Sequence, residues 1–195
     1  MLRAFAHFLL ELPIFVTGDS LRCAVQWPLL AGMAREDVSG PGTLAVLDAG
    51  CGRGVMGQGW RRIYGYRVIG CDPWPEGLAE ASRRGCYREL VEAALPALPF
   101  SDASFDRVVC TDVLEHLADD AAGLGELARL VKPGGKLILS VPMKPAPFRD
   151  PEHVREGYSL GDVLELGERA GLRLEHAEVC FLGLSRLLFR ATGWT

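Results

Sequence analysis

Two aspartates, Asp48 and Asp72, each end a short apolar run, and closely spaced glycines follow the first of them. Residues 46–54 read VLDAGCGRG, and residues 67–72 read RVIGCD. A glycine-rich turn after a strand lets a nucleoside-bearing cofactor approach the backbone, and a carboxylate about 20 residues further on can accept both hydroxyls of a ribose. Because ligands of open parallel sheets bind beyond the carboxyl ends of the strands, the two acids predict one cofactor site at that edge.

The spacing of the glycines disfavours one class of cofactor. A dinucleotide-binding turn carries Gly-x-Gly-x-x-Gly, whose third glycine lets the next helix pack closely on the strand. Here the glycines alternate from Gly50 to Gly54, and Val55 stands where that third glycine would be. The pattern therefore argues against a nicotinamide dinucleotide. A purely structural alternative is a tight turn in which Asp72 only caps the next helix, ahead of Pro73 and Pro75. This alternative explains one of the two acid-ended runs, but not both.

Three further runs carry a family resemblance. Residues 98–106 read LPFSDASFD, residues 113–117 read VLEHL, and residues 130–137 read LVKPGGKL. Together with the glycine-rich run and in this order, they closely resemble the class I S-adenosylmethionine-dependent methyltransferases. More narrowly, they are similar to the type 11-like group that acts on small molecules and lipids. The resemblance is dense over residues 44–142 and looser up to residue 181.

The resemblance implies a set of cofactor contacts. Gly50 and Gly52 would let the backbone approach the methionine end, Asp48 would order the loop and the ammonium group, and Asp72 would hold the ribose. Pro73 or Trp74 would pack against adenine, although Trp74 is equally well explained as an aromatic plug between helix and sheet. The full set of expected cofactor residues is Asp48, Gly50, Cys51, Gly52, Asp72, Pro73, Trp74, Ala94, Leu95 and Thr111.

One expected contact departs from the family pattern. Counted back from the LPF run, the usual Asp-Ala pair beside the adenine amino group falls on Ala94 and Leu95, so a methyl group replaces the carboxylate. A backbone carbonyl or water could substitute, and the Leu95 amide could still reach adenine. Loss of one charged hydrogen bond, worth about 1.5 to 3 kcal/mol, would weaken binding roughly tenfold to a hundredfold.

The acceptor side is expected among residues that follow the fourth and fifth strands. His116 is the candidate general base, and a structural imidazole at the start of a helix beside Glu115 is an equally good interpretation. His153 is a second candidate for catalysis, while Arg155 and Tyr158 are candidates for substrate contact in a segment that closes over the substrate in relatives of this kind. The same segment could instead be a solvated loop before an N-cap. No metal-ligand set is identified.

Alternating strands and helices predict an α/β, three-layer, Rossmann-like fold with a mostly parallel sheet of six or seven strands. We expect residues 1–40 to form an N-terminal helical cap and residues 41–195 the cofactor-binding domain. Residues 132–135 (KPGG) are expected to end a helix and turn. The predicted strands are 44–49, 67–71, 87–91, 106–111, 136–141 and 173–181, and the predicted helices after residue 40 are 54–64, 76–84, 118–131 and 159–170.

Composition and net charge limit the kinds of partner that this chain is expected to bind. The chain of 195 residues has a formal net charge of −4, which disfavours nucleic acid as a substrate. Its six cysteines show no paired C-x-x-C spacing, which suits a cytoplasmic protein, and its arginine-rich usage suggests a bacterial source. Residues 1–16 are apolar, but His7, Glu11 and Pro13 interrupt them, so no transmembrane segment is expected. Their apolar helical face could pack on the domain, or meet an apolar substrate or a membrane surface.

Two classes of function follow. The first is an S-adenosylmethionine-dependent methyltransferase that acts on oxygen, nitrogen or carbon of a small, apolar or lipid-like acceptor. The second is a noncatalytic S-adenosylmethionine-binding relative that serves as a partner or regulator, which the Ala94 departure favours.

Overall fold

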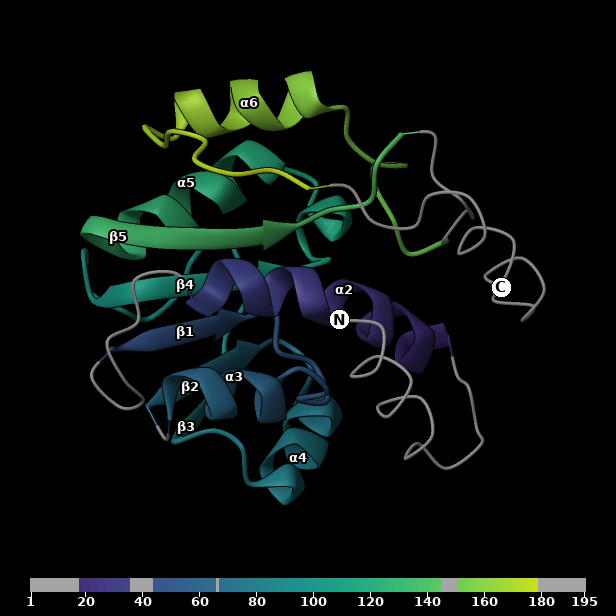
Figure 1. Ribbon diagram of the computed structural model, residues 1–195, viewed down its shortest axis with the longest axis vertical. Coiled ribbons are helices and arrows are strands. Elements are labelled where there is room, and N and C mark those ends of the chain that lie inside the picture. The colour runs from purple at the N-terminus through teal and green to yellow at the C-terminus, as the bar shows by residue number, and fades with distance from the viewer. Residues whose placement is uncertain (1–17, 36–43, 66, 145–150, 179–195) are drawn as a thin grey trace.

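The computed structural model describes residues 18–35, 44–65, 67–144 and 151–178, and the structural statements below refer to these residues (Figure 1). Helices and strands alternate along them, as the sequence predicts. The elements are α2 (Gly18–Arg35), β1 (Val46–Ala49), α3 (Gly57–Tyr64), β2 (Val68–Asp72), α4 (Pro75–Arg84), β3 (Glu89–Glu92), β4 (Phe105–Thr111), η1 (Leu114–His116), α5 (Asp120–Leu130), β5 (Val131–Ser140) and α6 (Leu160–Arg169).

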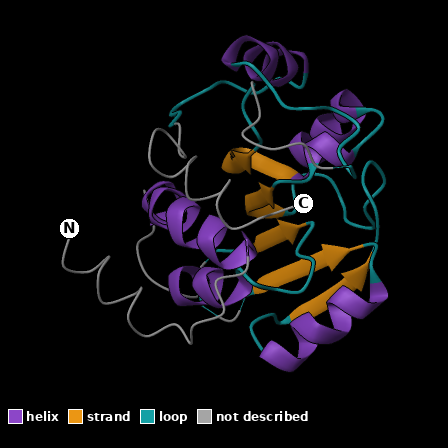
Figure 2. Cartoon of the chain, turned by 90° about the vertical axis from the view of Figure 1, so that its right-hand side faces the viewer, coloured by secondary structure: helices purple, strands orange, loops and turns teal. Residues whose placement is uncertain are grey.

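The five strands form one parallel sheet in the order β3-β2-β1-β4-β5, with helices on both sides of it (Figure 2). Neighbouring residues of β1 point to opposite faces: Val46 joins the core formed with α2 and α3, and Leu47 joins the core formed with α5. Both side chains are completely buried. This explains why the strands read as continuous apolar runs, because a parallel sheet is covered on both faces.

α2 closes one face of the sheet near its centre. Its Leu30 and Ala34 pack in the same core cluster as Val46 and Trp60. The Trp27 ring meets the Trp60 ring edge-on with centroids 4.9 Å apart. The helix therefore shares its core with the sheet. The division of the chain into a cap of residues 1–40 and a domain of residues 41–195 stays a prediction.

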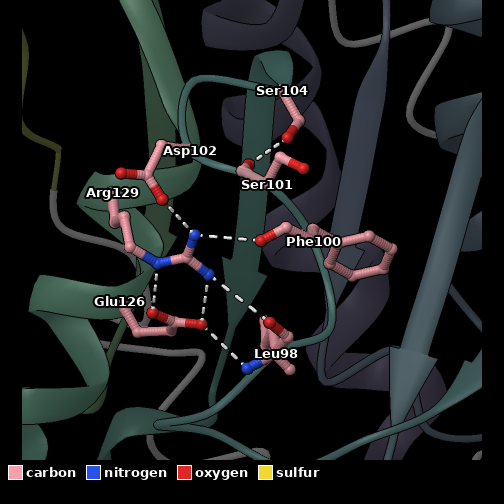
Figure 3. Close-up of polar contacts among 7 residues, drawn as sticks. All are labelled: Leu98, Phe100, Ser101, Asp102, Ser104, Glu126 and Arg129. Carbon is pink, nitrogen blue, oxygen red and sulfur yellow. Dashed lines mark hydrogen bonds and ion pairs between the residues drawn. The ribbon is translucent and has the colours of Figure 1, made fainter.

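The LPF run is held in place by one arginine of α5 (Figure 3). The Arg129 guanidinium makes a two-point ion pair with Glu126, both contacts at 2.7 Å, and donates to the Phe100 carbonyl at 2.9 Å. It also contacts Asp102 at 2.6 Å, while Glu126 accepts from the Leu98 amide at 2.8 Å. The motif thus fixes the connection between β3 and β4, which follows the expected adenine side of the cofactor site.

Two predicted local features differ from the structure. Residues 173–178 form no strand, because they are solvent-exposed and Leu174 has no sheet face on which to bury; residues 179–181 of the predicted strand lie outside the described residues. Residues 132–135 belong to β5 instead of a free turn, and the pairing register with β4 shifts at this point. Gly134 accommodates the irregularity with a φ of 77°.

The apolar helical face predicted within residues 1–16 lies outside the described residues. Among the helices that are described, none combines the length and the apolar character needed to cross a bilayer.

Candidate active site

The carboxyl ends of β1 and β2 meet at the glycine-rich loop. The amides of Gly50 and Cys51 both donate to the Cys71 carbonyl, at 2.8 and 3.0 Å, and the Gly52 amide donates to a carboxylate oxygen of Asp72 at 2.8 Å. The two acid-ended runs of the sequence are therefore brought together at one edge of the sheet, where the sequence predicts a cofactor site.

Two of the glycines are needed for different reasons. Gly50 has a φ of 77°, which side chains rarely adopt, and a Cβ at this position would lie 2.2 Å from the Val113 side chain. Only glycine therefore lets the loop pass so close to Val113, which follows β4. Gly52 has a φ of 49° and open space where its Cβ would be. This open space lies after the end of β1, next to the Asp72 carboxylate. It is compatible with the close approach of a nucleoside-bearing cofactor to the backbone.

Asp48 is a buried carboxyl at the end of β1, with 1% of its surface exposed. Burial raises its pKa to about 7; the Tyr87 hydroxyl, which donates to it at 2.7 Å, lowers the pKa, and the charge of Asp72 raises it further. Sequence reasoning missed Tyr87. A tyrosine ahead of a strand carries no local signal for this contact, which spans 39 positions of the chain.

Asp72 organises the loop on its other side as well. Its second carboxylate oxygen accepts from the Trp74 amide at 3.0 Å. The Trp74 ring lies against Gly77, has the Arg53 guanidinium 4.9 Å from its centroid and keeps 40% of its surface exposed. Trp74 is therefore partly exposed next to Asp72, and both its contact with adenine and the plug interpretation stay predictions. Pro73 next to it is also exposed.

The expected adenine pair lies just beyond β3. The Ala93 amide donates to the Asp72 carbonyl at 3.2 Å, which places this end of β3 beside Asp72, the predicted ribose-binding residue. Ala94 is exposed and Leu95 is partly buried. The structure thus brings both residues to the predicted edge and leaves the methyl group of Ala94 where relatives would carry a carboxylate.

The end of β4 is tied to α2 by residues that sequence reasoning missed. Asp112 follows Thr111 with a φ of 54°, and its carboxylate accepts from Ser140 at 2.9 Å and from the Gln26 amide group at 3.1 Å. Thr111 itself is partly buried. Gln26 lies 86 positions from Asp112, so nothing local in the sequence signals the pair. The contact connects α2 to the end of β4, at the edge where the cofactor site is predicted.

His116 and His153 come together although 36 residues lie between them. Their rings meet edge-on with centroids 4.7 Å apart. His116 Nδ1 lies 3.1 Å from the Glu152 carbonyl oxygen, which can only accept, so Nδ1 carries the proton and Nε2 keeps its lone pair. The amides of Val154 and Arg155 both donate to the Glu115 carbonyl, at 2.9 and 3.1 Å. The segment predicted to close over the substrate is thus docked on η1.

Tyr158 and Arg155 have clear structural partners. Tyr158 is completely buried, and its hydroxyl donates to Asp120 at 3.0 Å. Arg155 forms an ion pair with Asp120 at 3.2 Å and lies over the Tyr158 ring. These contacts favour a role in holding the segment against α5 over direct contact with an acceptor.

Comparison with known proteins assigns the fold and family. Residues 47–139 match a family model described as a methyltransferase domain. This stretch is a methyltransferase domain. A chain from Mesorhizobium loti described as an S-adenosylmethionine-dependent methyltransferase superposes with a TM-score of 0.64 over 80% of this chain and 84% of that one, at 21% identity. The predicted α/β Rossmann-like fold is confirmed.

Curated relatives agree with this family. A Mycolicibacterium smegmatis protein named as a probable S-adenosylmethionine-dependent methyltransferase is 36% identical over 144 residues, which are 71% of this chain and 55% of the relative. A ubiquinone biosynthesis O-methyltransferase from Xanthomonas oryzae is 37% identical over 112 residues, 55% of this chain and 45% of the relative. For the matched residues 47–139, the predicted class I methyltransferase family and its cofactor, S-adenosylmethionine, are confirmed.

A third relative, a demethylmenaquinone methyltransferase from Chlorobaculum parvum, is 33% identical over 120 residues, 61% of this chain and 50% of the relative. The chain spans about half the length of these curated relatives. The activity and the substrates of the whole protein are therefore proposals.

Proposed function

We propose that this methyltransferase transfers a methyl group from S-adenosylmethionine to a hydroxyl group of a small, apolar acceptor. The observation that carries the proposal is that the glycine and acid edge, at β1 and β2, and His116, just after the neighbouring strand β4, lie at the same end of the sheet, with the His153 ring packed on His116. Relatives named for ubiquinone and menaquinone methylation support an apolar acceptor.

On the donor side, the residues mainly bind and orient. Gly50 and Gly52 give the methionine end access to backbone, Asp72 accepts from the ribose hydroxyls, and the exposed face of Trp74 packs on adenine. A carboxylate has about four lone-pair positions, so Asp72 can hold the loop and the ribose together. When bound, S-adenosylmethionine supplies both the electrophilic methyl carbon and the leaving group.

On the acceptor side, a hydroxyl nucleophile must lose a proton. The Nε2 lone pair of His116 can take it, since Nδ1 is committed to the Glu152 carbonyl. The His153 ring packs edge-on against the His116 ring. General base catalysis of this kind contributes about 10²- to 10⁴-fold in rate, and alignment of the nucleophile with the methyl carbon and sulfur contributes more.

The second candidate is a noncatalytic S-adenosylmethionine-binding relative. One observation favours it: Ala94 is exposed at the position where the family carries the adenine carboxylate. Weak cofactor binding without turnover would be the signature of this candidate.

The proposal is tested by following a labelled methyl group from S-adenosylmethionine to a panel of apolar phenols and catechols. We expect label on the acceptor oxygen, with one S-adenosylhomocysteine formed per methyl transferred. His116→Gln should lower kcat by at least tenfold with an unchanged affinity for S-adenosylhomocysteine, and His176→Gln, on an exposed segment, is the matched control. Cofactor binding with no transfer to any acceptor would support the noncatalytic candidate instead.

A further inference from the structure

Three potential metal ligands meet beside the expected acceptor position. One ligand atom each from Glu115, His116 and His153 lies within 4.8 Å of the other two. Two of these residues come from η1 and the third from the segment that follows β5, so the fold assembles the group from distant parts of the chain. The sequence predicted no such set, because the two histidines lie far apart along it.

The group is held in position by its surroundings. The Val154 and Arg155 amides fix the His153 segment to the Glu115 carbonyl, and the Glu152 carbonyl orients the His116 ring through Nδ1. A backbone carbonyl that fixes the far nitrogen of an imidazole is a usual outer contact of a metal-ligating histidine, because it leaves Nε2 to face the ion. The same arrangement is present here.

The burial of Glu115 provides a second observation. Only 1% of its surface is exposed, although it is an acidic residue. A buried carboxylate attracts a cation more strongly than an exposed one, because the protein interior screens charge less than water does. The two imidazoles next to it are partly open to solvent, so an ion can reach the group from that side.

We propose that Glu115, His116 and His153 bind one divalent transition-metal ion. Imidazole nitrogen and carboxylate oxygen suit zinc and its neighbours in the first row, with metal–ligand distances of about 2.0 to 2.2 Å. Ligand atoms around such an ion lie roughly 3.3 to 3.6 Å apart, so the side chains would close by up to about 1.5 Å on binding. Three protein ligands leave a coordination position for water or for an acceptor oxygen.

The proposal deepens the proposed function and rests on it for its role in the reaction. The cation lowers the pKa of an acceptor hydroxyl next to it, and the proton leaves to solvent. The new O–C bond forms at the methyl carbon while the C–S bond breaks, and its electron pair stays on sulfur, which gives S-adenosylhomocysteine. With the ion present, His116 binds metal and is no longer the base.

The experiment uses the full chain and separates metal binding from turnover. Zinc is titrated against a chromophoric chelator, and cobalt is titrated in parallel for its visible absorption spectrum. We expect one ion per chain, and a loss of at least a hundredfold in zinc affinity in both His153→Gln and His116→Gln. His176→Gln, which removes another of the four histidines, should bind zinc as the wild type does.

The affinity for S-adenosylhomocysteine reports whether each variant is folded, and it should not change. Zinc binding that is the same in His153→Gln, or that is absent in the folded wild type, would overturn the metal site. Label transfer that persists after complete chelation would overturn its role while the proposed function stands. A metal-binding chain that transfers no methyl group would overturn the proposed function and leave the metal site standing.

Discussion

The Tyr87 hydroxyl donates a 2.7 Å hydrogen bond to the buried carboxyl of Asp48, directly before the glycine-rich loop. Because the pKa of Asp48 is raised to about 7, a large fraction of this carboxyl holds a proton at neutral pH in the folded chain. The unfolded chain, with an ordinary aspartate, would be ionised. Folding therefore costs free energy that grows as the pH rises from about 4 to about 7.

Asp48→Asn should stabilise the protein at pH 8. The amide keeps an acceptor for Tyr87 and removes the cost of burying a charge, which is at most about 4 kcal/mol for a pKa raised by this amount. Thermal unfolding measured from pH 3 to pH 8 should show a gain in stability above pH 7 that disappears towards pH 3. An equal gain at all pH values would show that ionisation of Asp48 is not its cause.

Asp72→Ala should weaken S-adenosylhomocysteine binding by at least tenfold without unfolding the domain, because Asp72 serves the loop and the ribose and is only partly buried. The control is Glu89→Ala, which removes an exposed acid from the opposite end of β3. Calorimetric titration of both variants provides the comparison. An unchanged dissociation constant in a folded Asp72→Ala variant would remove this residue from the site.

Ala94→Asp should tighten S-adenosylhomocysteine binding by about tenfold or more, since a carboxylate would accept from the exocyclic adenine nitrogen. Ala97→Asp, at an exposed position on the same connection, controls for added charge. Equal affinity in the Ala94→Asp variant and the wild type would mean that another group already satisfies adenine.

Arg129→Met should destabilise the domain by about 2 kcal/mol at pH 7, because it leaves Glu126 and the Phe100 carbonyl without their donor. The hydrogen bond from Arg129 lowers the pKa of Glu126 in the folded state, so this contribution is present above the ordinary glutamate pKa and is lost as the pH falls through the folded value. Denaturant unfolding at pH 7 and pH 3.5 should show a smaller difference at the acid pH. A difference of the same size at both would contradict the ionic contribution.

Local patterns predicted the strands and the glycine-rich loop that form the candidate cofactor edge of the sheet. Apolar runs that end in Asp48 and Asp72 became β1 and β2, and the glycines between them adopt the positive φ values that only glycine accepts easily. These features are predictable because each depends on a few consecutive residues. The LPF run was recognised by resemblance, and its physical basis is the Arg129 network.

Contacts between distant segments were not predictable in the same way. The pairs Tyr87 with Asp48 and Gln26 with Asp112 join parts of the chain 39 and 86 positions apart, and their residue types carry no local signal. Tyr158 follows a polar segment, which suggested exposure, yet the packing of that segment on α5 buries it completely. A strand was predicted over residues 173–181, but residues 173–178 form none, because pairing with a neighbouring strand decides whether a strand forms.

The central claim is that the edge formed by Asp48, Gly50, Gly52 and Asp72 binds S-adenosylmethionine and not a nicotinamide dinucleotide. The most direct measurement is isothermal titration of the full chain with S-adenosylhomocysteine and, separately, with NAD. We expect one S-adenosylhomocysteine bound per chain and no heat of binding with NAD. Binding of NAD, or no binding of S-adenosylhomocysteine by the folded chain, would contradict it.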